Sequence, residues 1–355
     1  MSYKISFNCL KFSPALLFLL FFQPLMGQGN KKIVKELGTA NYGELDETVQ
    51  RNQKALGGNF VTLLWTDTIV YKRESGEFDS RTLAPLESAS QWLTAALVMK
   101  MVEEGKLSLD DKVAKYLPIF ESYGKSYITI RHCLSHFTGI QTDGGFLSKK
   151  KFGSLEEEVE AFAKKEIQAN PGTEFRYSNA GPNIAGRILE VITKKKFDML
   201  AKQKLFNPLG MRKSTFGNLD GSALSPASGA QSSADEFMNF LQMLLNKGQF
   251  KGQPFLTEAS VQELRKLQTT PALIKYAPKG AEGYGYALGS WVVEEGKDAA
   301  NALSGPALPG CFPLIDWCRG YALLLFTKNS STDQKKETLL ALKNAADEKL
   351  PSKCR

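Results

Sequence analysis

The sequence is poor in residues that build metal centres. It contains only two histidines among 355 residues, His132 and His136. Their spacing of four residues is compatible with metal binding, but no third ligand stands at a motif spacing from them. The five cysteines form no CxxC pair and no zinc-type pattern. We therefore expect no metal and no cofactor, and we interpret both histidines as structural.

Long apolar runs are also absent. The longest uninterrupted run, residues 15–22, has eight residues, whereas a helix that spans a bilayer needs roughly 20. Two lysines precede this run and a small residue follows it, which is the pattern of a secretory signal peptide. We predict a signal peptide over residues 1–27 and a mature chain over residues 28–355. The mature chain is expected to be periplasmic or secreted, with no stable membrane span.

The cysteines of the mature chain allow a disulfide. Export to an oxidising compartment permits disulfide bonds. Cys311 and Cys318 flank a predicted turn and are candidates for such a bond, and isolated thiols are the alternative. Cys133 lies beside His132 in a helical pattern, and we interpret it as a core residue rather than a nucleophile.

The charge pattern argues against a nucleic-acid partner. Lysine and arginine number 45 against 37 acidic residues, which gives a formal net charge of +8. The basic residues are scattered, and aromatic residues do not alternate with them as they do on nucleic-acid-binding faces. We interpret the basic residues as solvated surface and expect no nucleic-acid partner.

Segments rich in β-formers lie towards both ends of the mature chain, and helical patterns fill the middle. Residues 60–65 and 68–73 predict a hairpin, and further β-rich segments return near the end of the sequence. A chain that leaves a sheet for a helical insertion and then returns builds the sheet from both of its ends. We predict a sheet subdomain from residues about 40–106 and 269–350, and a helical subdomain over about 107–268.

Two short segments carry residues suited to chemistry. Residues 86–100, LESASQWLTAALVMK, predict a buried helix with Ser88 at its start. Side chains three residues apart share a helix face, so Gln91 is expected beside Ser88. A glutamine cannot take the proton of a serine, although its amide can hold neighbouring groups by hydrogen bonds. The second segment is YSN at residues 177–179, which follows a Pro-Gly break.

These segments occur in order with ITIRHCLSHFTGI, PGTEFRYSNAGPNIAGRILE and LFNPLGM. The set resembles the serine β-lactamase and penicillin-binding D,D-peptidase superfamily, on its class C and serine-esterase side, over residues about 88–329. The resemblance implies an α/β (α+β) fold of the β-lactamase/transpeptidase type, with an antiparallel sheet flanked by helices and a mostly helical domain. It also implies an active site in the cleft between them, and a small-molecule or peptide ligand such as one derived from the cell wall.

The resemblance assigns a role to each matching residue. Ser88 takes the nucleophile position of the family's Ser-x-x-Lys motif, and Gln91 stands where the family has lysine. Tyr177 matches the proton acceptor or relay of the Tyr-x-Asn motif. Asn179 matches the residue that orients the substrate.

The third family motif, Lys-Thr-Gly or His-x-Gly on a strand, is not intact. The nearest match is the pair Ser304 and Gly305. A serine hydroxyl can hydrogen-bond a substrate, but it supplies no charge for a carboxylate. A structural turn is the alternative interpretation of this segment.

Two functions remain open from the sequence. The first is an exported serine hydrolase that acts on an ester or amide, such as a peptide, a β-lactam or a small ester, through acyl-Ser88. Its activity is expected to be weak or altered, because Gln91 supplies no base, and general-base help is typically worth about 10² to 10⁴ in rate. The second is a catalytically degenerate member that binds a peptidoglycan-like ligand or a protein partner in the old active-site cleft.

Overall fold

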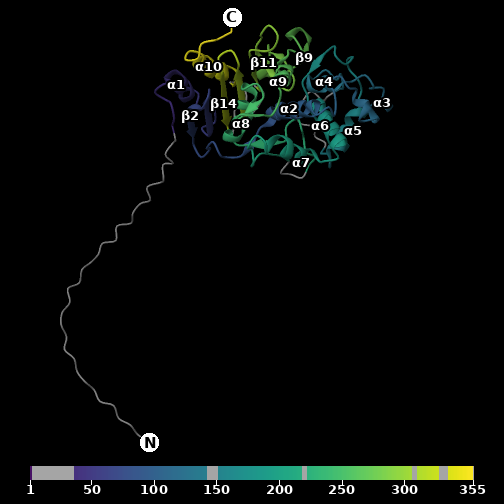
Figure 1. Cartoon of the computed structure of the whole chain (residues 1–355), viewed down its shortest axis with the longest axis horizontal. Coiled ribbons are helices and arrows are strands. Elements are labelled where there is room, and N and C mark those ends of the chain that lie inside the picture. The colour runs from purple at the N-terminus through teal and green to yellow at the C-terminus, as the bar shows by residue number, and fades with distance from the viewer. Residues whose placement is uncertain (2–35, 142–150, 218–221, 306–309, 328–334, 355) are drawn as a thin grey trace, which may run out of the picture. The chain divides into compact units, whose positions relative to one another are not determined.

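The computed structural model describes residue 1 and residues 36–141, 151–217, 222–305, 310–327 and 335–354 (Figure 1). The predicted signal peptide lies, apart from Met1, outside the described residues. Within the described ranges, no helix is long and apolar enough to cross a membrane.

A seven-stranded antiparallel sheet lies at the centre of residues 34–355, which form one compact unit. The sheet takes strands from both ends of the chain, as the sequence predicts. Its order is β10 (Gly285–Tyr286), β11 (Trp291–Glu294), β12 (Ala302–Ser304), β13 (Cys311–Asp316), β14 (Tyr321–Thr327), β1 (Phe60–Trp65) and β2 (Ile69–Ser75). Strands β1 and β2 form the predicted hairpin, and β1 also pairs with β14 along its whole length.

Helices and short two- or three-stranded ladders make up much of the remaining described chain (Figure 1). The α-helices are α1 (Gly43–Arg51), α2 (Ser90–Glu103), α3 (Ile119–Ser122), α4 (Ile130–Leu134), α5 (Leu155–Lys164), α6 (Ala180–Thr193), α7 (Phe197–Ala201), α8 (Ala234–Leu245), α9 (Glu258–Arg265) and α10 (Lys335–Asp347). The short helices are η1 (Glu87–Ala89), η2 (Val113–Lys115), η3 (Lys202–Phe206), η4 (Pro271–Leu273) and η5 (Lys279–Ala281). The small ladders join β3 (Ala84–Pro85), β6 (Ala230–Ser232) and β5 (Thr215–Phe216); β4 (Phe175–Arg176) and β9 (Ile274–Tyr276); and β7 (Gln249–Phe250) and β8 (Gln253–Pro254).

Alternating side chains of the central strands enter two different cores, because successive residues of a strand point to opposite faces. On β1, Phe60 and Leu64 join a cluster that contains the apolar residues of α1 and α10. Val61 and Leu63 face the other way and join a larger cluster with α2 and α8. Helices therefore cover both faces of the sheet. The family fold expected from the sequence is confirmed, while the boundaries of its two subdomains stay a prediction.

The turn between β10 and β11 contacts α2 at Gln91. Gly289 in this turn has a φ of +79°, and a Cβ there would lie 2.7 Å from the carbonyl oxygen of Gln91 and 2.8 Å from Ala95 Cβ. A glycine is required by both the backbone angle and the lack of space. This close approach brings Tyr286 and Trp291, on the two flanking strands, to the first turns of α2.

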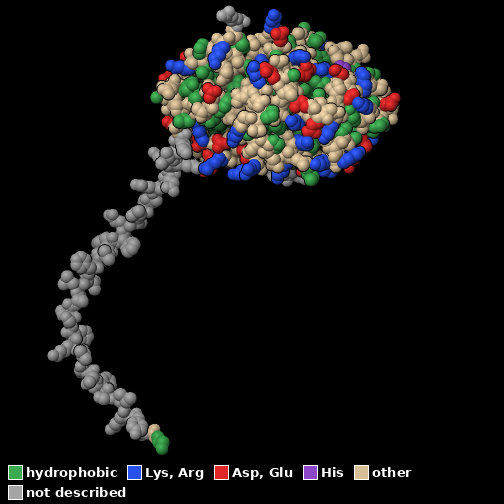
Figure 2. Space-filling view, viewed as in Figure 1, with side chains coloured by type: hydrophobic (Ala, Val, Ile, Leu, Met, Phe, Trp, Pro, Cys, Tyr) green, Lys and Arg blue, Asp and Glu red, His purple; other side chains and the backbone are tan. Residues whose placement is uncertain are grey.

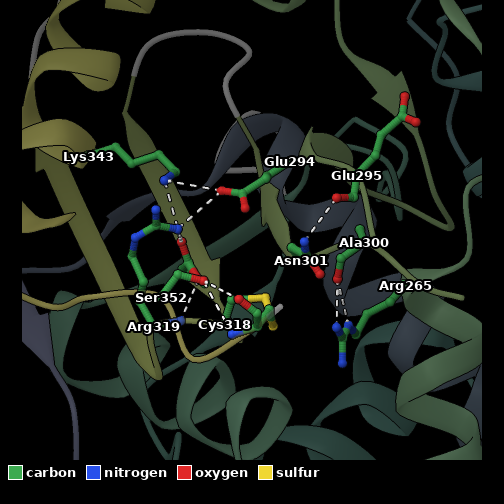
Figure 3. The surroundings of a disulfide bond; sticks show 11 residues. Arg265, Glu294, Glu295, Ala300, Asn301, Cys318, Arg319, Lys343 and Ser352 are labelled. Atoms are coloured by element: carbon green, nitrogen blue, oxygen red, sulfur yellow. Dashed lines mark hydrogen bonds and ion pairs between the residues drawn. A yellow bond between two sulfur atoms is a disulfide. The ribbon is translucent and has the colours of Figure 1, made fainter. Parts of the chain in front are cut away.

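The disulfide joins a different pair of cysteines from the pair considered in the sequence. Cys318 bonds Cys354, and Cys311 is a buried free thiol, as is Cys133 (Figure 3). The predicted candidate pair, Cys311 with Cys318, is therefore wrong. Cys311 is the first residue of β13 and Cys318 lies in the turn that follows it. The five strand steps from residue 311 to residue 316 alone span roughly 17 Å, whereas a disulfide needs Cα atoms within about 7 Å.

The surface agrees with a solvated charge pattern. On the face shown in Figure 2, basic and acidic side chains are interspersed. Many of them pair, as Lys115 does with Asp111 at 2.9 Å and Lys247 with Glu258 at 2.8 Å.

Candidate active site

Ser88 lies on η1, in the turn that leads into α2, and its side chain is buried. The residue before it, Glu87, has a φ of +49°, in the left-handed region that non-glycine residues avoid at a cost of about 1–2 kcal/mol. Strain of this kind gathers at functional sites, where the surrounding structure holds it. The Ser88 side chain hydrogen-bonds the Tyr177 phenol, so the two predicted catalytic residues are in contact.

Tyr177 follows β4 and is held in an aromatic cluster. Its N–H donates to the Tyr276 carbonyl oxygen of β9 at 3.1 Å. Its ring centroid lies 4.5 Å from that of His136 and 5.4 Å from that of Trp291. Burial raises the pKa of Tyr177 strongly; the hydrogen bond with Ser88 opposes this shift, and nearby Tyr276 adds to it. Because burial, the largest cause, raises this pKa above the ordinary value for tyrosine, the phenol is neutral at pH 7.

Gln91 is almost completely buried, with 1% of its surface exposed. Its Oε1 accepts a hydrogen bond from the Tyr286 hydroxyl at 3.0 Å. The Nε2 of His136 lies 3.0 Å from the same oxygen. The Nε2 of Gln91 is buried and has no hydrogen-bond partner among the described residues. Position 91, which the resemblance aligns with the family's lysine, therefore holds a neutral amide hydrogen-bonded to neutral groups.

His136 is neutral and carries its proton on Nε2. Its Nδ1 accepts the backbone N–H of Ser178 at 3.3 Å, which requires that this nitrogen has no proton. Burial lowers the pKa of His136 to about 3, so the ring is uncharged at neutral pH. The Nε2–H group is then a donor towards Gln91 Oε1, with the Tyr286 hydroxyl also 3.0 Å from Nε2.

Two other polar side chains of α2 bond the backbone of distant elements. Lys100 points away from the site, because its Nζ donates to the Phe255 carbonyl oxygen at 2.5 Å. Ser90 is buried, and its Oγ accepts the Ala230 N–H at 3.1 Å. Both side chains therefore serve packing between elements rather than the chemistry at Ser88.

The remaining predicted residues, Asn179, Ser304 and Gly305, differ in what they offer. Asn179 is the residue before α6, and its Oδ1 is buried without a hydrogen-bond partner in the described part of the chain. A Cβ at Gly305 would lie 3.8 Å from Ala89 Cβ, so the end of β12 reaches η1. Ser304 is fully buried and its hydroxyl donates to the Pro313 carbonyl oxygen at 2.7 Å. That bond uses the proton of the Ser304 hydroxyl, so this hydroxyl can only accept a hydrogen bond from a ligand.

Sequence reasoning missed two residues of this site, His136 and Tyr286. The two histidines were interpreted alike, yet only His132 has a purely local role: its Nδ1 accepts the Thr129 N–H at 3.3 Å at the start of α4. His136 instead bonds residues far away in sequence. ITIRHCLSHFTGI carried a signal for His136, since it is one of the segments of the resemblance, but no motif marks Tyr286. Over the described residues, no three His, Cys, Asp or Glu side chains are arranged to hold a metal.

An open hollow of about 540 Å³ adjoins this centre on the outer side of β9. Tyr276 lines it, and the same tyrosine influences the pKa of Tyr177. Lys275 and Lys279 also line the hollow, with Glu282 as its acidic residue. Tyr276 is therefore the residue that the hollow shares with the surroundings of Tyr177.

Comparisons with known proteins agree with this geometry. A family model described as Beta-lactamase matches residues 41–346. Penicillin-binding protein 4 of Amycolatopsis lactamdurans is 35% identical over 130 residues, which are 36% of this chain and 34% of that protein. The chain spans about a third of the length of the curated relatives it matches.

Solved structures share the fold. A protein of Bacteroides dorei DSM 17855 superposes with a TM-score of 0.77 at 24% identity, over 86% of this chain and 98% of that one. A family VIII carboxylesterase superposes with a TM-score of 0.74 at 16% identity, over 89% of this chain and 100% of that one. The fold and the Ser88–Tyr177 pair define a serine-hydrolase type of protein. With the family model matched over most of its length, the chain belongs to the beta-lactamase family.

Proposed function

We propose that the protein is an exported serine hydrolase that cleaves an ester or amide through acyl-Ser88, with activity weakened because Gln91 replaces the family lysine. The observation that carries the proposal is the hydrogen bond between Ser88 and Tyr177 in a buried site. A serine hydroxyl becomes nucleophilic only when a neighbour accepts its proton. Tyr177 contacts that hydroxyl and can take this part.

The neutral state of Tyr177 favours a relay over a fixed base. As Ser88 Oγ attacks the carbonyl carbon, its proton passes to Tyr177 Oη, and the proton of Tyr177 passes to the leaving group. Water then attacks the acyl-enzyme, and the same relay runs in reverse to return the proton to Ser88. The backbone N–H of Ser88 is proposed as part of the oxyanion hole.

The substrate class follows from the missing charge. Without a lysine to assist Tyr177, the rate is expected to be lower by about 10² to 10⁴. Esters with good leaving groups lose least from this, because they need little protonation. Penicillin-binding protein 4 and a carboxylesterase among the similar proteins support a ligand with an acyl group, such as a cell-wall peptide or a small ester. The lysines of the hollow beside Tyr276 favour an anionic group on that ligand.

Export is part of the proposal. Disulfides persist in oxidising compartments and are rare in the cytosol. The bond between Cys318 and Cys354 therefore supports a periplasmic or secreted location. It agrees with the signal-peptide pattern of residues 1–27.

A second candidate function is a non-catalytic binder of a peptidoglycan-like ligand or a protein partner. The raised pKa of Tyr177, caused mainly by burial, favours this candidate, because it keeps the phenol neutral. Such a protein would keep the cleft and the orienting groups while Ser88 is never acylated.

Covalent labelling separates the two candidates. The mature protein is incubated with a fluorophosphonate and with a fluorescent penicillin, and its intact mass is measured over hours. We expect one adduct with the fluorophosphonate, which Ser88→Ala abolishes and the matched control Ser90→Ala retains. If the wild type gains no mass at long times, the hydrolase proposal fails and the binder remains.

A further inference from the structure

The oxygen of the Gln91 amide is fixed by two groups from distant parts of the chain. The Tyr286 hydroxyl of β10 donates to Oε1, and the Nε2 of His136 lies at the same distance, 3.0 Å. His136 follows α4, and Tyr286 is 195 residues from Gln91 in sequence. Three separate elements therefore meet at one buried amide oxygen.

The protonation pattern makes both neighbours donors. His136 Nδ1 already accepts the Ser178 N–H, so the ring proton is on Nε2 and faces Gln91 Oε1. A carboxamide turned by 180° would place its NH₂ group against the Nε2–H of His136 and lose that hydrogen bond, and the Tyr286 hydroxyl would have to turn from donor to acceptor. The amide has one satisfied orientation, and that orientation fixes its Nε2 as well, because the group is planar.

The same pocket is unsuited to an ammonium group. A lysine has three donors and no acceptor when charged, so it would meet the Nε2–H of His136 without complementarity. Turning the His136 proton to Nδ1 would place it against the Ser178 N–H. The surroundings of position 91 are therefore matched to an amide oxygen, which a simple loss of the family lysine does not explain.

We infer that His136 and Tyr286 are positioning residues that lock the Gln91 carboxamide in one orientation on the first turn of α2, and thereby hold the start of this helix, with Ser88, in a reactive geometry. Both contacts join Oε1 of a side chain that is 1% exposed to residues of distant elements, and a buried hydrogen-bonding group is costly to leave unpaired. The inference rests on the proposed function only where it concerns turnover. The hydrogen-bond lock itself exists in a hydrolase or in a binder.

The first test measures the tautomer of His136, which the hydrogen bonds to Gln91 require, and it does not depend on catalysis. The mature chain has two histidines, so a long-range ¹H–¹⁵N spectrum of the labelled protein shows two imidazole rings, and His132→Asn assigns them. We expect His136 as the Nε2–H tautomer with no titration between pH 5 and 8. A ring protonated on Nδ1, or a ring that titrates in this range, would overturn the inference.

The second test measures how these hydrogen bonds affect the reactivity of Ser88. Tyr286→Phe removes one donor to Gln91, and we expect the rate of fluorophosphonate labelling and kcat for an activated ester to fall about tenfold or more, with little change in KM. His136→Leu is expected to act in the same way, and His136→Gln, which restores an N–H donor near the position of Nε2, is expected to recover part of the loss. His132→Asn keeps the wild-type rate.

The outcomes of the two tests are distinguishable from failure of the hydrolase proposal. If wild type does not label at all, the proposed function fails while the imidazole spectrum still decides on the lock. If wild type labels and Tyr286→Phe, folded by circular dichroism, keeps the full rate, the positioning role is wrong. If His136→Leu does not fold, Tyr286→Phe and the spectrum still give the answer.

Discussion

Two buried polar networks lie in different parts of the molecule, and only one of them contains charge. Around Gln91, an amide, an imidazole and a phenol meet as neutral groups. At the end of β13, the fully buried Asp316 carboxylate contacts Arg319 at 3.0 Å and Lys343 at 3.4 Å. Figure 3 shows Arg319 and Lys343 on this side of the sheet, near the disulfide of Cys318.

The difference lies in the availability of counter-ions. Lys343 Nζ has Asp347 at 2.6 Å and Glu294 at 3.6 Å in addition to Asp316. Buried charge is tolerated when it is paired, and it is expensive when it is not. Burial is the largest cause of the shift in the pKa of both His136 and Tyr177, and it favours the neutral form of each ring. A lysine at position 91 would be a buried cation without a partner, and a glutamine avoids that cost.

The largest expected effect comes from removing charge where charge is paired. Asp316→Asn keeps the shape of the side chain but leaves Arg319 and Lys343 with one fewer counter-ion in a buried place. We expect the free energy of unfolding to fall by about 3–5 kcal/mol, measured by urea denaturation with circular dichroism. Labelling of Ser88 in the folded variant should be unchanged, because the cluster makes no contact with the site.

An exposed ion pair provides the matched control. Lys247 and Glu258 lie 2.8 Å apart with 65% and 52% of their side chains exposed. Lys247→Gln is expected to cost less than about 1 kcal/mol. If Asp316→Asn lowers the free energy of unfolding no more than Lys247→Gln does, burial does not strengthen the ion pairs of Asp316.

The next effect comes from introducing charge where charge is absent. Gln91→Lys places an ammonium group among donors, and we expect a loss of about 2–3 kcal/mol in unfolding free energy. Desolvation lowers the pKa of such a buried lysine, by up to 3–5 units, which leaves a neutral amine able to accept the Ser88 proton. Hydrolysis of a chromogenic ester should therefore rise, by at least tenfold, while stability falls.

A lysine-length control separates charge from shape. Gln91→Met is uncharged and of similar length, and it should lose the two hydrogen bonds at Oε1 without any gain in hydrolysis. If Gln91→Lys shows no rise in rate, more than the base has been lost from this site. If the Gln91→Lys variant is as stable as wild type, a counter-ion pairs with the new lysine in the pocket.

The same contrast explains what the sequence could and could not predict. Ser88 and Tyr177 lie in long segments whose local patterns and order resemble the family, so the fold and the nucleophile pair were predictable. The network at Gln91 was not, because Tyr286 reaches it across 195 residues through a glycine turn. Burial, which sets the protonation of His136, is a property of the packed fold and has no local pattern.

The disulfide shows the same limit at the other network. Cys311 and Cys318 are near in sequence, but an extended strand between them sets their distance. Cys354 is 36 residues from Cys318, and the chain returns it through α10. The sequence spacing suggested a turn between Cys311 and Cys318, but most of the residues between them belong to a strand.

The smallest effect depends on pH and concerns the neutral network. The pKa of His136 is about 3 in the folded protein because of burial, against roughly 6.5 in an unfolded chain. Its contribution to stability is complete above pH 6.5 and is lost as the pH falls towards 3, because only the unfolded state binds the proton. The desolvated Glu158, with a pKa of about 7, acts in the opposite direction over the same range. Both wild type and His136→Gln contain Glu158, so its contribution cancels when their free energies of unfolding are subtracted. The difference in free energy of unfolding should shrink by about 2 kcal/mol from pH 8 to pH 5. Parallel unfolding curves for the two proteins over this range would show that His136 accepts a proton in the folded state, and the neutral character of the site would be lost with it.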